Sequence, residues 1–473
     1  MRDNALWRRS ATDLAALIGK GEVSARDAAA AAIARMEAVN PGLNAVVVPC
    51  AEEAMATAAA LDEAQARGEP LGLLHGVPVT VKTNVDQKGH ATSNGVEAFA
   101  DVMASEDSPV VANLRKAGAV IIGRTNTSEF SFRADTDNPL FGRTHNPWGP
   151  HVSAGGSSGG AGAAVMAGIG ALGHGNDIGG SLRFPAAANG ATTVKPGIGR
   201  VPAFNPSQTA ERGMLAQSMS VQGVIARDAR DVALGMRALV AADWRDPWHV
   251  AQPFDRPPGH VGKIKVAVTK ETFEFALHPD VATALDEAAG ALADAGYEVV
   301  EVEPPMVREI GHVAYRALMG EIEALMGDAI RRFGSPTINQ IFACYYELFP
   351  PFKGVELLEM MAKRSYYARA WNDFLETYPL VLTPFLPAPF FAPNRDAEGV
   401  AGANEALGAA IWSYSMNLLG LPAGNVAGHF NGVQPIGVQI VGRRFHEDMI
   451  LEACATVEAR PGSMAERLWA RRT

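Results

Sequence analysis

Apolar and polar positions near the start of the chain repeat with the period of a helix. The pattern over 11–39 predicts two helices that break at Gly19–Gly21, with Ser24 placed to cap the second one. The run Asn40–Pro41–Gly42 should end that helix, because proline and glycine interrupt helical backbone. A short strand over 43–48 and another helix over 51–67 are expected to follow.

The segment 76–84, GVPVTVKTN, alternates between apolar and polar residues. Its valines face one way while Thr80 and Lys82 face the other, which predicts a strand with Lys82 on its polar side. GAVIIGRTN, over 118–126, predicts a buried strand that ends in a polar turn.

The second half of the chain alternates strand and helix patterns. Strands predicted over 263–269 and 297–303 flank a helix over 280–295, so these two strands should pair in parallel. Two more strand candidates cover 379–387 and 435–442.

Between these strands, the segment 306–372 is helical in pattern and rich in Met, Tyr and Phe, which predicts an inserted helical cap. Neither a repeat of fixed period nor a flexible linker is present in the sequence. We therefore predict an α/β fold in a single domain, 1–473, with the cap over about 306–372.

Composition narrows the class of protein. Hydrophobic residues make up 48% and charged residues 19%, which favours a deeply cored enzyme. A net charge of −10 argues against direct binding of nucleic acid. The weakly polar run 161–173 is too short to span a bilayer, and no signal-peptide pattern is seen. The three cysteines, far apart and odd in number, predict no disulfide framework and fit the cytoplasm.

Histidine spacing predicts no metal site, because HExxH, HxxEH and HxH are all absent from the sequence. We therefore expect neither a metal nor a cofactor. His151 and His174 lie near the glycine-rich segment and are expected to be supporting or surface groups.

Lys82 has two interpretations. In the first, its stem lies along the sheet and its ammonium reaches water, as in most lysines. In the second it is a buried neutral base, which requires its pKa to fall from about 10.4 to about 7. Apolar walls and neighbouring serine hydroxyls would favour the neutral form.

The segment AGGSSGGAG, over 154–162, holds Ser157 and Ser158 among glycines. It satisfies G-x-S-x-G, the pattern of a hydrolase nucleophile that stands on a turn directly after a strand. The preceding residues contain Pro147 and Pro150 and are typical of turns, so this interpretation fails. A Gly/Ser surface loop is the simpler alternative.

Ser181 follows two glycines in GNDIGGS. The N–H groups of Ile178, Gly179, Gly180 and Ser181 can point at one place, as in an oxyanion hole, and SLRFPAAAN predicts a short helix whose positive end adds to the site. An anion-binding turn or a plain tight turn is the alternative. A serine hydroxyl is a poor nucleophile until a base takes its proton, so the rest of the chain must supply one.

Together these motifs resemble the amidase signature family. GVPVTVKTN, GRTNTSEFS, FGRTHNPW, GGSSGGAGAAV, GNDIGGSLRFPAA and KPGIGRVP occur in the family's order. The N-terminal helices and the C-terminal segments NLLGLPAGNVAG and GVQPIGVQIVGRRFHEDMIL extend the resemblance over nearly the whole chain. It is weakest over 205–375.

The resemblance implies a mixed β-sheet of about eleven strands between helical layers, with a catalytic core over about 70–202. It implies Ser181 as nucleophile, Ser157 as a bridging serine on a cis peptide bond, and Lys82 as base. Lys82 would take the proton of Ser157 while Ser157 takes that of Ser181. The N–H groups from Ile178 to Ser181 would form the oxyanion hole.

The chain departs from the family in HVSAGG over 151–156, in PAGNVAG over 422–428, and at the two positions Asn176 and Arg133. Asn176 stands where Ser or Thr is usual, so its amide must take over the support of the bridging serine or leave the relay looser. Arg133 stands where small residues are common. Ser158, Asp177 and Arg183 should support the site, Asp177 by orienting the loop and Arg183 by pairing within the core.

These features predict an amide hydrolase that acts on small aryl or acyl amides through an acyl-enzyme; carbamates and esters fit the same chemistry. The Phe-rich segments 349–352 and 383–393 could line an apolar substrate pocket or belong to the ordinary core. The rival function is that of the A subunit in a glutamyl-tRNA amidotransferase, which needs partner chains to bind tRNA. A catalytically idle scaffold subunit is the third alternative. The expected partner is a small-molecule amide, without nucleic acid or membrane, and a homodimer is left open.

Overall fold

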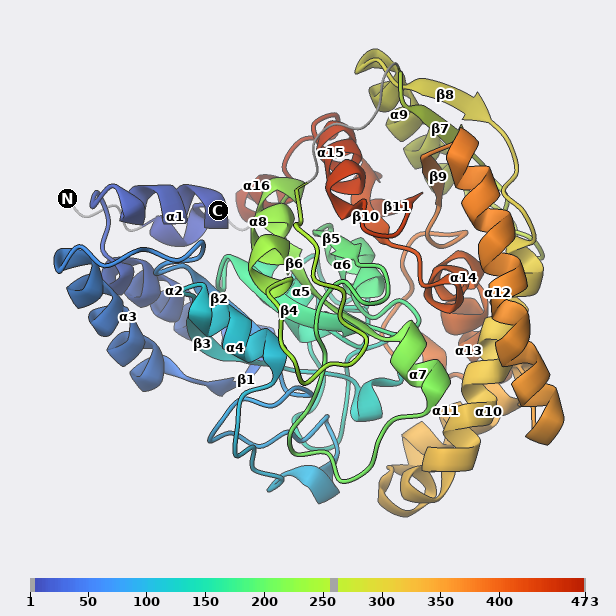
Figure 1. Ribbon diagram of the computed structural model, residues 1–473, viewed down its shortest axis with the longest axis horizontal. Coiled ribbons are helices and arrows are strands. Elements are labelled where there is room, and N and C mark those ends of the chain that lie inside the picture. The colour runs from blue at the N-terminus through green and yellow to red at the C-terminus, as the bar shows by residue number, and fades with distance from the viewer. Residues whose placement is uncertain (1–4, 256–262, 472–473) are drawn as a thin grey trace.

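Short apolar strands from the whole length of the chain pair in one mixed sheet (Figure 1). The structure is a computed structural model that describes residues 5–255 and 263–471, and within these ranges the sheet has 11 strands in the order β1-β3-β2-β4-β6-β5-β10-β11-β9-β7-β8. Pairing is parallel between β2 and its neighbours β3 and β4, and between β7 and its neighbours β8 and β9; the other neighbours are antiparallel. The predicted mixed α/β sheet is confirmed.

The strands are short, as the spacing of turn residues in the sequence requires. Their bounds are β1 Val46–Pro49, β2 Pro78–Lys82, β3 Val120–Thr125, β4 Leu172–Asp177, β5 Thr192–Lys195, β6 Val221–Ala226, β7 Lys265–Val268, β8 Glu298–Glu301, β9 Leu380–Pro384, β10 Ala423–Phe430 and β11 Pro435–Gly442.

The N-terminal helices form where the pattern predicts them. α1 (Ala11–Gly19) and α2 (Ala25–Val39) are separated by a turn in which Gly21 takes a φ of 71°, a conformation that favours glycine. The Ser24 hydroxyl caps α2 by accepting a hydrogen bond of 2.9 Å from the N–H of Asp27. α3 (Ala51–Ala66) follows β1, as expected.

Helices cover both faces of the sheet over two large apolar cores, and a third, smaller core gathers residues of α2, α3, β3 and α5 (Gly159–Met166). Along β11, Val438 and Ile440 point into one core and Val441 points into the other, as the alternation of a strand requires. The first core contains α1, α4 (Pro109–Lys116), α8 (Ala229–Leu239), α9 (Pro279–Asp294) and α15 (Glu447–Glu458). The second contains α5, α6 (Arg183–Asn189), α7 (Met214–Met219), α13 (Gly399–Ala403), α14 (Ile411–Leu419) and α16 (Met464–Ala470).

Three long helices occupy the region in which the sequence predicts a cap. They are α10 (Val307–Phe333), α11 (Pro336–Leu348) and α12 (Gly354–Thr377), and they join the second core along one side of the molecule (Figure 1). Within the described ranges, no helix combines the length and the apolar character needed to cross a bilayer.

Candidate active site

Lys82 ends β2 in the interior of the sheet and is completely buried. Its Nζ lies 2.7 Å from Ser157 Oγ, 2.8 Å from Asn176 Oδ1 and 3.1 Å from Ser158 Oγ. Burial lowers the pKa of Lys82 well below its usual value, and the negative charge of Asp177 opposes that shift only in part. The structure therefore favours the uncharged amine that a general base requires.

Ser157 and Ser158 lie buried in the loop before α5, and the peptide bond between Gly156 and Ser157 is cis. The loop packs closely on its surroundings, because a Cβ at Gly156 would lie 2.3 Å from the main-chain oxygen of Arg133. Residues 147–156, all of them described, form no strand. The interpretation as a strand-to-helix hydrolase turn is therefore excluded by the structure as well.

The loop after β4 carries Ser181, which is partly exposed. The Ser158 N–H donates to the main-chain oxygen of Ser181 at 3.3 Å, so the two serine-bearing loops touch. Glycine is required at 179, because a Cβ there would lie 2.4 Å from the Tyr414 ring. Among the residues that the structure describes, the Ser181 hydroxyl forms no hydrogen bond.

One predicted oxyanion donor is already engaged. The Gly180 N–H donates to Asp177 Oδ1 at 2.8 Å, so it is not a free donor, contrary to the prediction. The physical reason is that the Asp177 carboxylate folds back over its own loop and also accepts the N–H of Leu182 at 3.1 Å. The N–H groups of Ile178, Gly179 and Ser181 are left as candidates.

Asp177 and Arg183 form a fully buried ion pair that fixes this loop to α6. Arg183 donates to both carboxylate oxygens, at 3.0 and 2.9 Å, and also to Gln439 Oε1 at 2.9 Å. Burial alone would raise the pKa of Asp177, but the Arg183 guanidinium and the charge of Lys195 hold it at about 2. Asp177 and Arg183 are two of the residues expected to support the site, and their ion pair lies against the loop that carries Ser181.

Asn176 contacts Lys82 and also forms a two-way amide pair that sequence analysis missed. Its Nδ2 donates to Asn84 Oδ1 at 2.9 Å, and Asn84 Nδ2 donates back to Asn176 Oδ1 at 3.2 Å. Asn84 Nδ2 also donates to Ser131 Oγ at 3.0 Å. The signal was present in the sequence, because Asn84 stands two positions after Lys82 in KTN.

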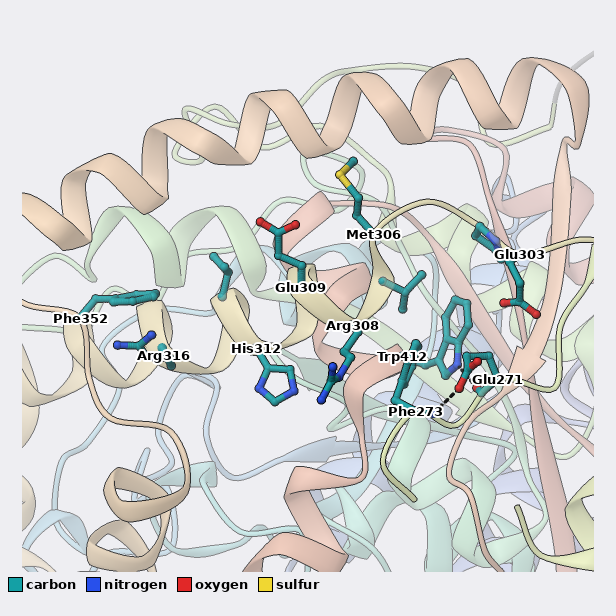
Figure 2. A pocket seen from close by; sticks show the side chains of 13 residues that line it. Glu271, Phe273, Glu303, Met306, Arg308, Glu309, His312, Arg316, Phe352 and Trp412 are labelled. Carbon is teal, nitrogen blue, oxygen red and sulfur yellow. Dashed lines mark hydrogen bonds between the residues drawn. The ribbon is translucent and has the colours of Figure 1, made fainter. Parts of the chain in front are cut away.

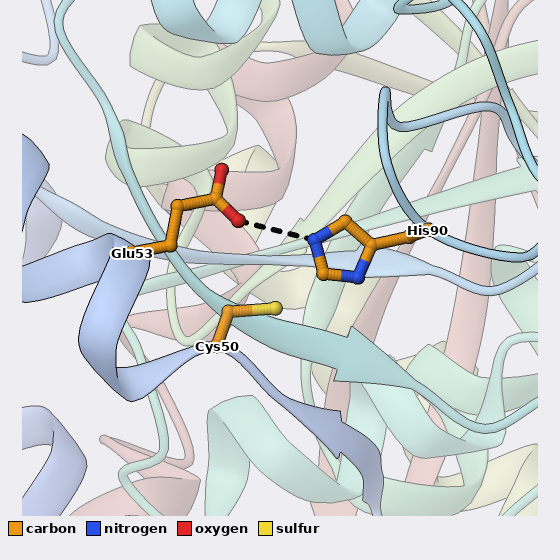
Figure 3. A group of neighbouring side chains, drawn as sticks. All are labelled: Cys50, Glu53 and His90. Carbon is orange, nitrogen blue, oxygen red and sulfur yellow. Dashed lines mark hydrogen bonds and ion pairs between the residues drawn. The ribbon is translucent and has the colours of Figure 1, made fainter.

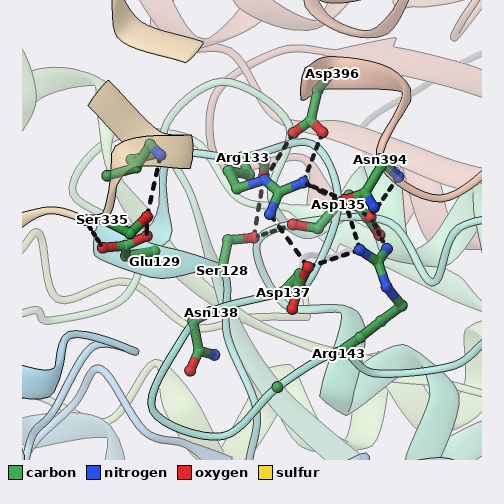
Figure 4. Close-up of polar contacts among 12 residues, drawn as sticks. Ser128, Glu129, Arg133, Asp135, Asp137, Asn138, Arg143, Ser335, Asn394 and Asp396 are labelled. Carbon is green, nitrogen blue, oxygen red and sulfur yellow. Dashed lines mark hydrogen bonds and ion pairs between the residues drawn. The ribbon is translucent and has the colours of Figure 1, made fainter. Parts of the chain in front are cut away.

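Arg133, another departure from the family pattern, is buried in an ion-pair cluster (Figure 4). It binds Asp396 through Nε at 3.1 Å and Nη2 at 2.9 Å. Arg143 lies beside this pair and binds Asp137 at 2.6 Å. The cluster ties the segment that packs against Gly156 to the residues around 394–396.

The histidines near the glycine-rich segment lie outside the serine–lysine contact. His174 is buried against Gln222 Oε1 at 3.0 Å, and burial lowers its pKa to about 3. His151 is exposed.

Elsewhere, Cys50, Glu53 and His90 bring their ligand atoms within 4.8 Å of one another (Figure 3). Glu53 binds Arg115 at 2.7 Å and His90 at 3.0 Å, so protein groups already compensate its charge.

A groove of about 680 Å³ lies beside the first turns of α10 (Figure 2). Its walls include Arg308, His312 and Trp412, and none of the predicted catalytic side chains lines it. Glu274 pairs with Arg308 at 3.2 Å and with His312 at 3.0 Å. The groove is therefore a separate feature of the surface.

Known proteins resemble this chain over nearly its whole length. The Amidase family profile matches residues 27–451. An indoleacetamide hydrolase of Bradyrhizobium diazoefficiens is 45% identical over 98% of this chain and 88% of its own. The A subunit of the glutamyl-tRNA(Gln) amidotransferase from Moorella thermoacetica is 31% identical over 96% of each chain. The crystal structure of a bacterial aryl acylamidase of the amidase signature family superposes with a TM-score of 0.84 at 27% identity, covering 98% of this chain and 99% of that one. The chain therefore belongs to the amidase family and is a hydrolase of carbon–nitrogen bonds other than peptide bonds.

Proposed function

We propose that the chain hydrolyses amides through an acyl-enzyme on Ser181, with Ser157 as bridging serine and Lys82 as general base. The observation that carries the proposal is the 2.7 Å contact between Lys82 Nζ and Ser157 Oγ in a fully buried setting. A neutral amine and a hydroxyl in this contact can pass a proton, whereas an ammonium could not accept one.

The proposed reaction combines the contact between Lys82 and Ser157 with a rotation of the Ser181 hydroxyl. With substrate bound, the Ser181 hydroxyl turns toward Ser157, and its oxygen bonds to the amide carbon as its proton moves to Ser157 and that of Ser157 moves to Lys82. The oxyanion is stabilised by N–H groups of Ile178, Gly179 and Ser181. The same path returns the proton to the departing nitrogen, and water then releases the acid by the same sequence of steps.

For the substrate, we infer a small primary amide on an aromatic acetyl group, of which indole-3-acetamide is the candidate. The indoleacetamide hydrolase similar to this chain supports this choice, as does the likeness to an aryl acylamidase. Aromatic side chains also lie beside the site. Phe132, which is partly exposed, follows the Ser131 that contacts Asn84, and its ring centroid lies 5.3 Å from that of Phe342. We place the reaction in the cytoplasm, where the free Cys50, Cys344 and Cys454 would stay reduced.

The experiment is ammonia release by the purified chain alone, with indole-3-acetamide, phenylacetamide, glutamine, an anilide and a carbamate. We expect turnover of the arylacetamides by the wild type and none by Ser181→Ala. The amidotransferase alternative has the support of the 31% identical relative. It predicts that glutamine hydrolysis begins only when the partner chains of such a complex are supplied. Inertness under both conditions would leave the scaffold alternative and contradict the proposal.

A further inference from the structure

Lys82 faces more acceptors than an uncharged amine has hydrogens. A neutral amine has two N–H bonds and one lone pair, and three oxygens surround Nζ, from Ser157, Ser158 and Asn176. Asn176 Oδ1 can only accept, so it takes one N–H. The Ser158 hydroxyl points its own proton toward the main-chain oxygen of Asn176, at 3.4 Å, so it accepts the other. The lone pair is then left for the hydroxyl proton of Ser157.

This assignment depends on which end of the Asn176 amide faces Lys82. The two-way pair of Asn176 and Asn84 would survive if both amides turned over together. Asn176 Nδ2 would then aim an N–H at the lone pair of Lys82, and the amine could no longer receive a proton from Ser157. Something beyond the pair must therefore fix its direction.

Ser131 supplies that direction. Its hydroxyl has one proton and donates it to Asn94 Oδ1 at 2.6 Å, so it accepts from its other two neighbours, Asn84 Nδ2 and the Thr127 hydroxyl at 3.0 Å. Asn84 must therefore present Nδ2 to Ser131, at 3.0 Å, and Oδ1 to Asn176 Nδ2. Asn205 Nδ2 donates to the main-chain carbonyl of Asn84 at 3.0 Å, a contact that does not involve the Asn84 side-chain amide.

We propose that Asn84 is a positioning residue that orients Asn176, so that the lone pair of Lys82 is left for Ser157. The inference rests on the proposed function and deepens it. It also accounts for an asparagine at 176. The paired Asn84 amide can fix the orientation of the Asn176 amide, so that only its acceptor oxygen faces Lys82.

The test compares Asn84→Ala, Asn84→Asp and the matched control Asn205→Ala, which touches Asn84 only through its main chain. The readout is the rate at which a serine-directed sulfonyl fluoride labels Ser181, followed by mass spectrometry as a function of pH, with Ser181→Ala as the blank. This readout needs no knowledge of the substrate. Thermal unfolding of each variant verifies that it is folded.

Asn84→Ala should slow labelling roughly 10- to 100-fold at every pH, a part of the roughly 10²–10⁴-fold that a positioned base contributes. Asn84→Asp should also move the rise of labelling to higher pH, because a carboxylate near Lys82 favours the ammonium. Asn205→Ala should keep the wild-type profile. Wild-type rates and profiles in folded Asn84 variants would overturn this inference alone, while a wild type that is not labelled at Ser181 would overturn the proposed function and the inference together.

Discussion

Asp177 and Arg183 meet through two hydrogen bonds in a pair from which water is excluded, and the same carboxylate accepts the N–H groups of Gly180 and Leu182. The loop that carries Ser181 is thus shaped by a buried charge. This arrangement makes the loop sensitive to the protonation of Asp177.

Replacing Asp177 by Asn should therefore cost about 3–5 kcal/mol of unfolding free energy, because it leaves Arg183 buried without a counter-charge. The pKa of Asp177 is lowered to about 2, so its stabilising contribution is complete above the usual value of 3.8 and is lost as the pH falls toward 2. Denaturant unfolding of both proteins should show a difference in unfolding free energy that narrows as the pH falls from 3.8 toward 2. A constant difference would contradict the role of the charge.

The lowered pKa of Lys82 makes two further quantities depend on pH. Turnover should fall as the pH drops through the lowered pKa, because the ammonium cannot act as a base. The unfolded chain also binds a proton on Lys82 that the folded chain lacks, so the stability of the wild type relative to Lys82→Met should rise with pH up to the usual value of 10.5. Denaturant unfolding of the two proteins at several pH values measures this difference, and a difference independent of pH would show that Lys82 is charged in the folded protein.

Gly179→Ala should reduce kcat by at least about tenfold, because the added methyl group meets the Tyr414 ring and displaces the N–H groups offered to the oxyanion. The matched control is Gly19→Ala, where nothing lies within 4 Å of the new Cβ. Steady-state kinetics on the best amide of the panel measures both. Equal loss in the two variants would mean that the effect is not local to the site.

Arg133→Ala should destabilise the protein by about 3–5 kcal/mol, because Asp396 would remain buried and unpaired. Adding Asp396→Ala should recover part of that loss, since the orphan charge is then removed. Arg331→Ala serves as a control on the surface, where breaking the exposed pair with Glu323 should leave the stability almost unchanged. A cost at Arg133 as small as that at Arg331 would show that the buried cluster does not hold the fold together.

Sequence reasoning succeeded for strands and helices with a clear period. Alternation predicted β2, and the N-cap at Ser24 predicted the start of α2. It missed β4, β5, β6 and β10, whose residues are mostly or entirely buried; β4 and β10, with the sequences LGHGND and AGNVAGHF, are also rich in small residues. Such strands show no alternation, because neither face is in contact with water.

At the candidate site, motif and order predicted that Lys82 meets the serines of the glycine-rich loop, and Lys82 does contact Ser157 and Ser158. The predicted contact between the hydroxyl groups of Ser181 and Ser157 is not among the hydrogen bonds of the described residues. The direction of the individual hydrogen bonds at the site could not be predicted. That the Gly180 N–H turns to Asp177 follows from the fold of one loop, and the link from Asn84 to Ser131 joins segments distant in sequence. Which partner a donor or acceptor will face depends on neighbours that only the folded chain brings together.

The most direct measurement is rapid quenching of the wild type during turnover of indole-3-acetamide, followed by digestion and mass spectrometry. We predict an arylacetyl group on the peptide bearing Ser181 and its absence in Ser181→Ala. An acyl group on Ser157 or Ser158, or steady turnover by Ser181→Ala, would contradict the assignment of Ser181 as the nucleophile.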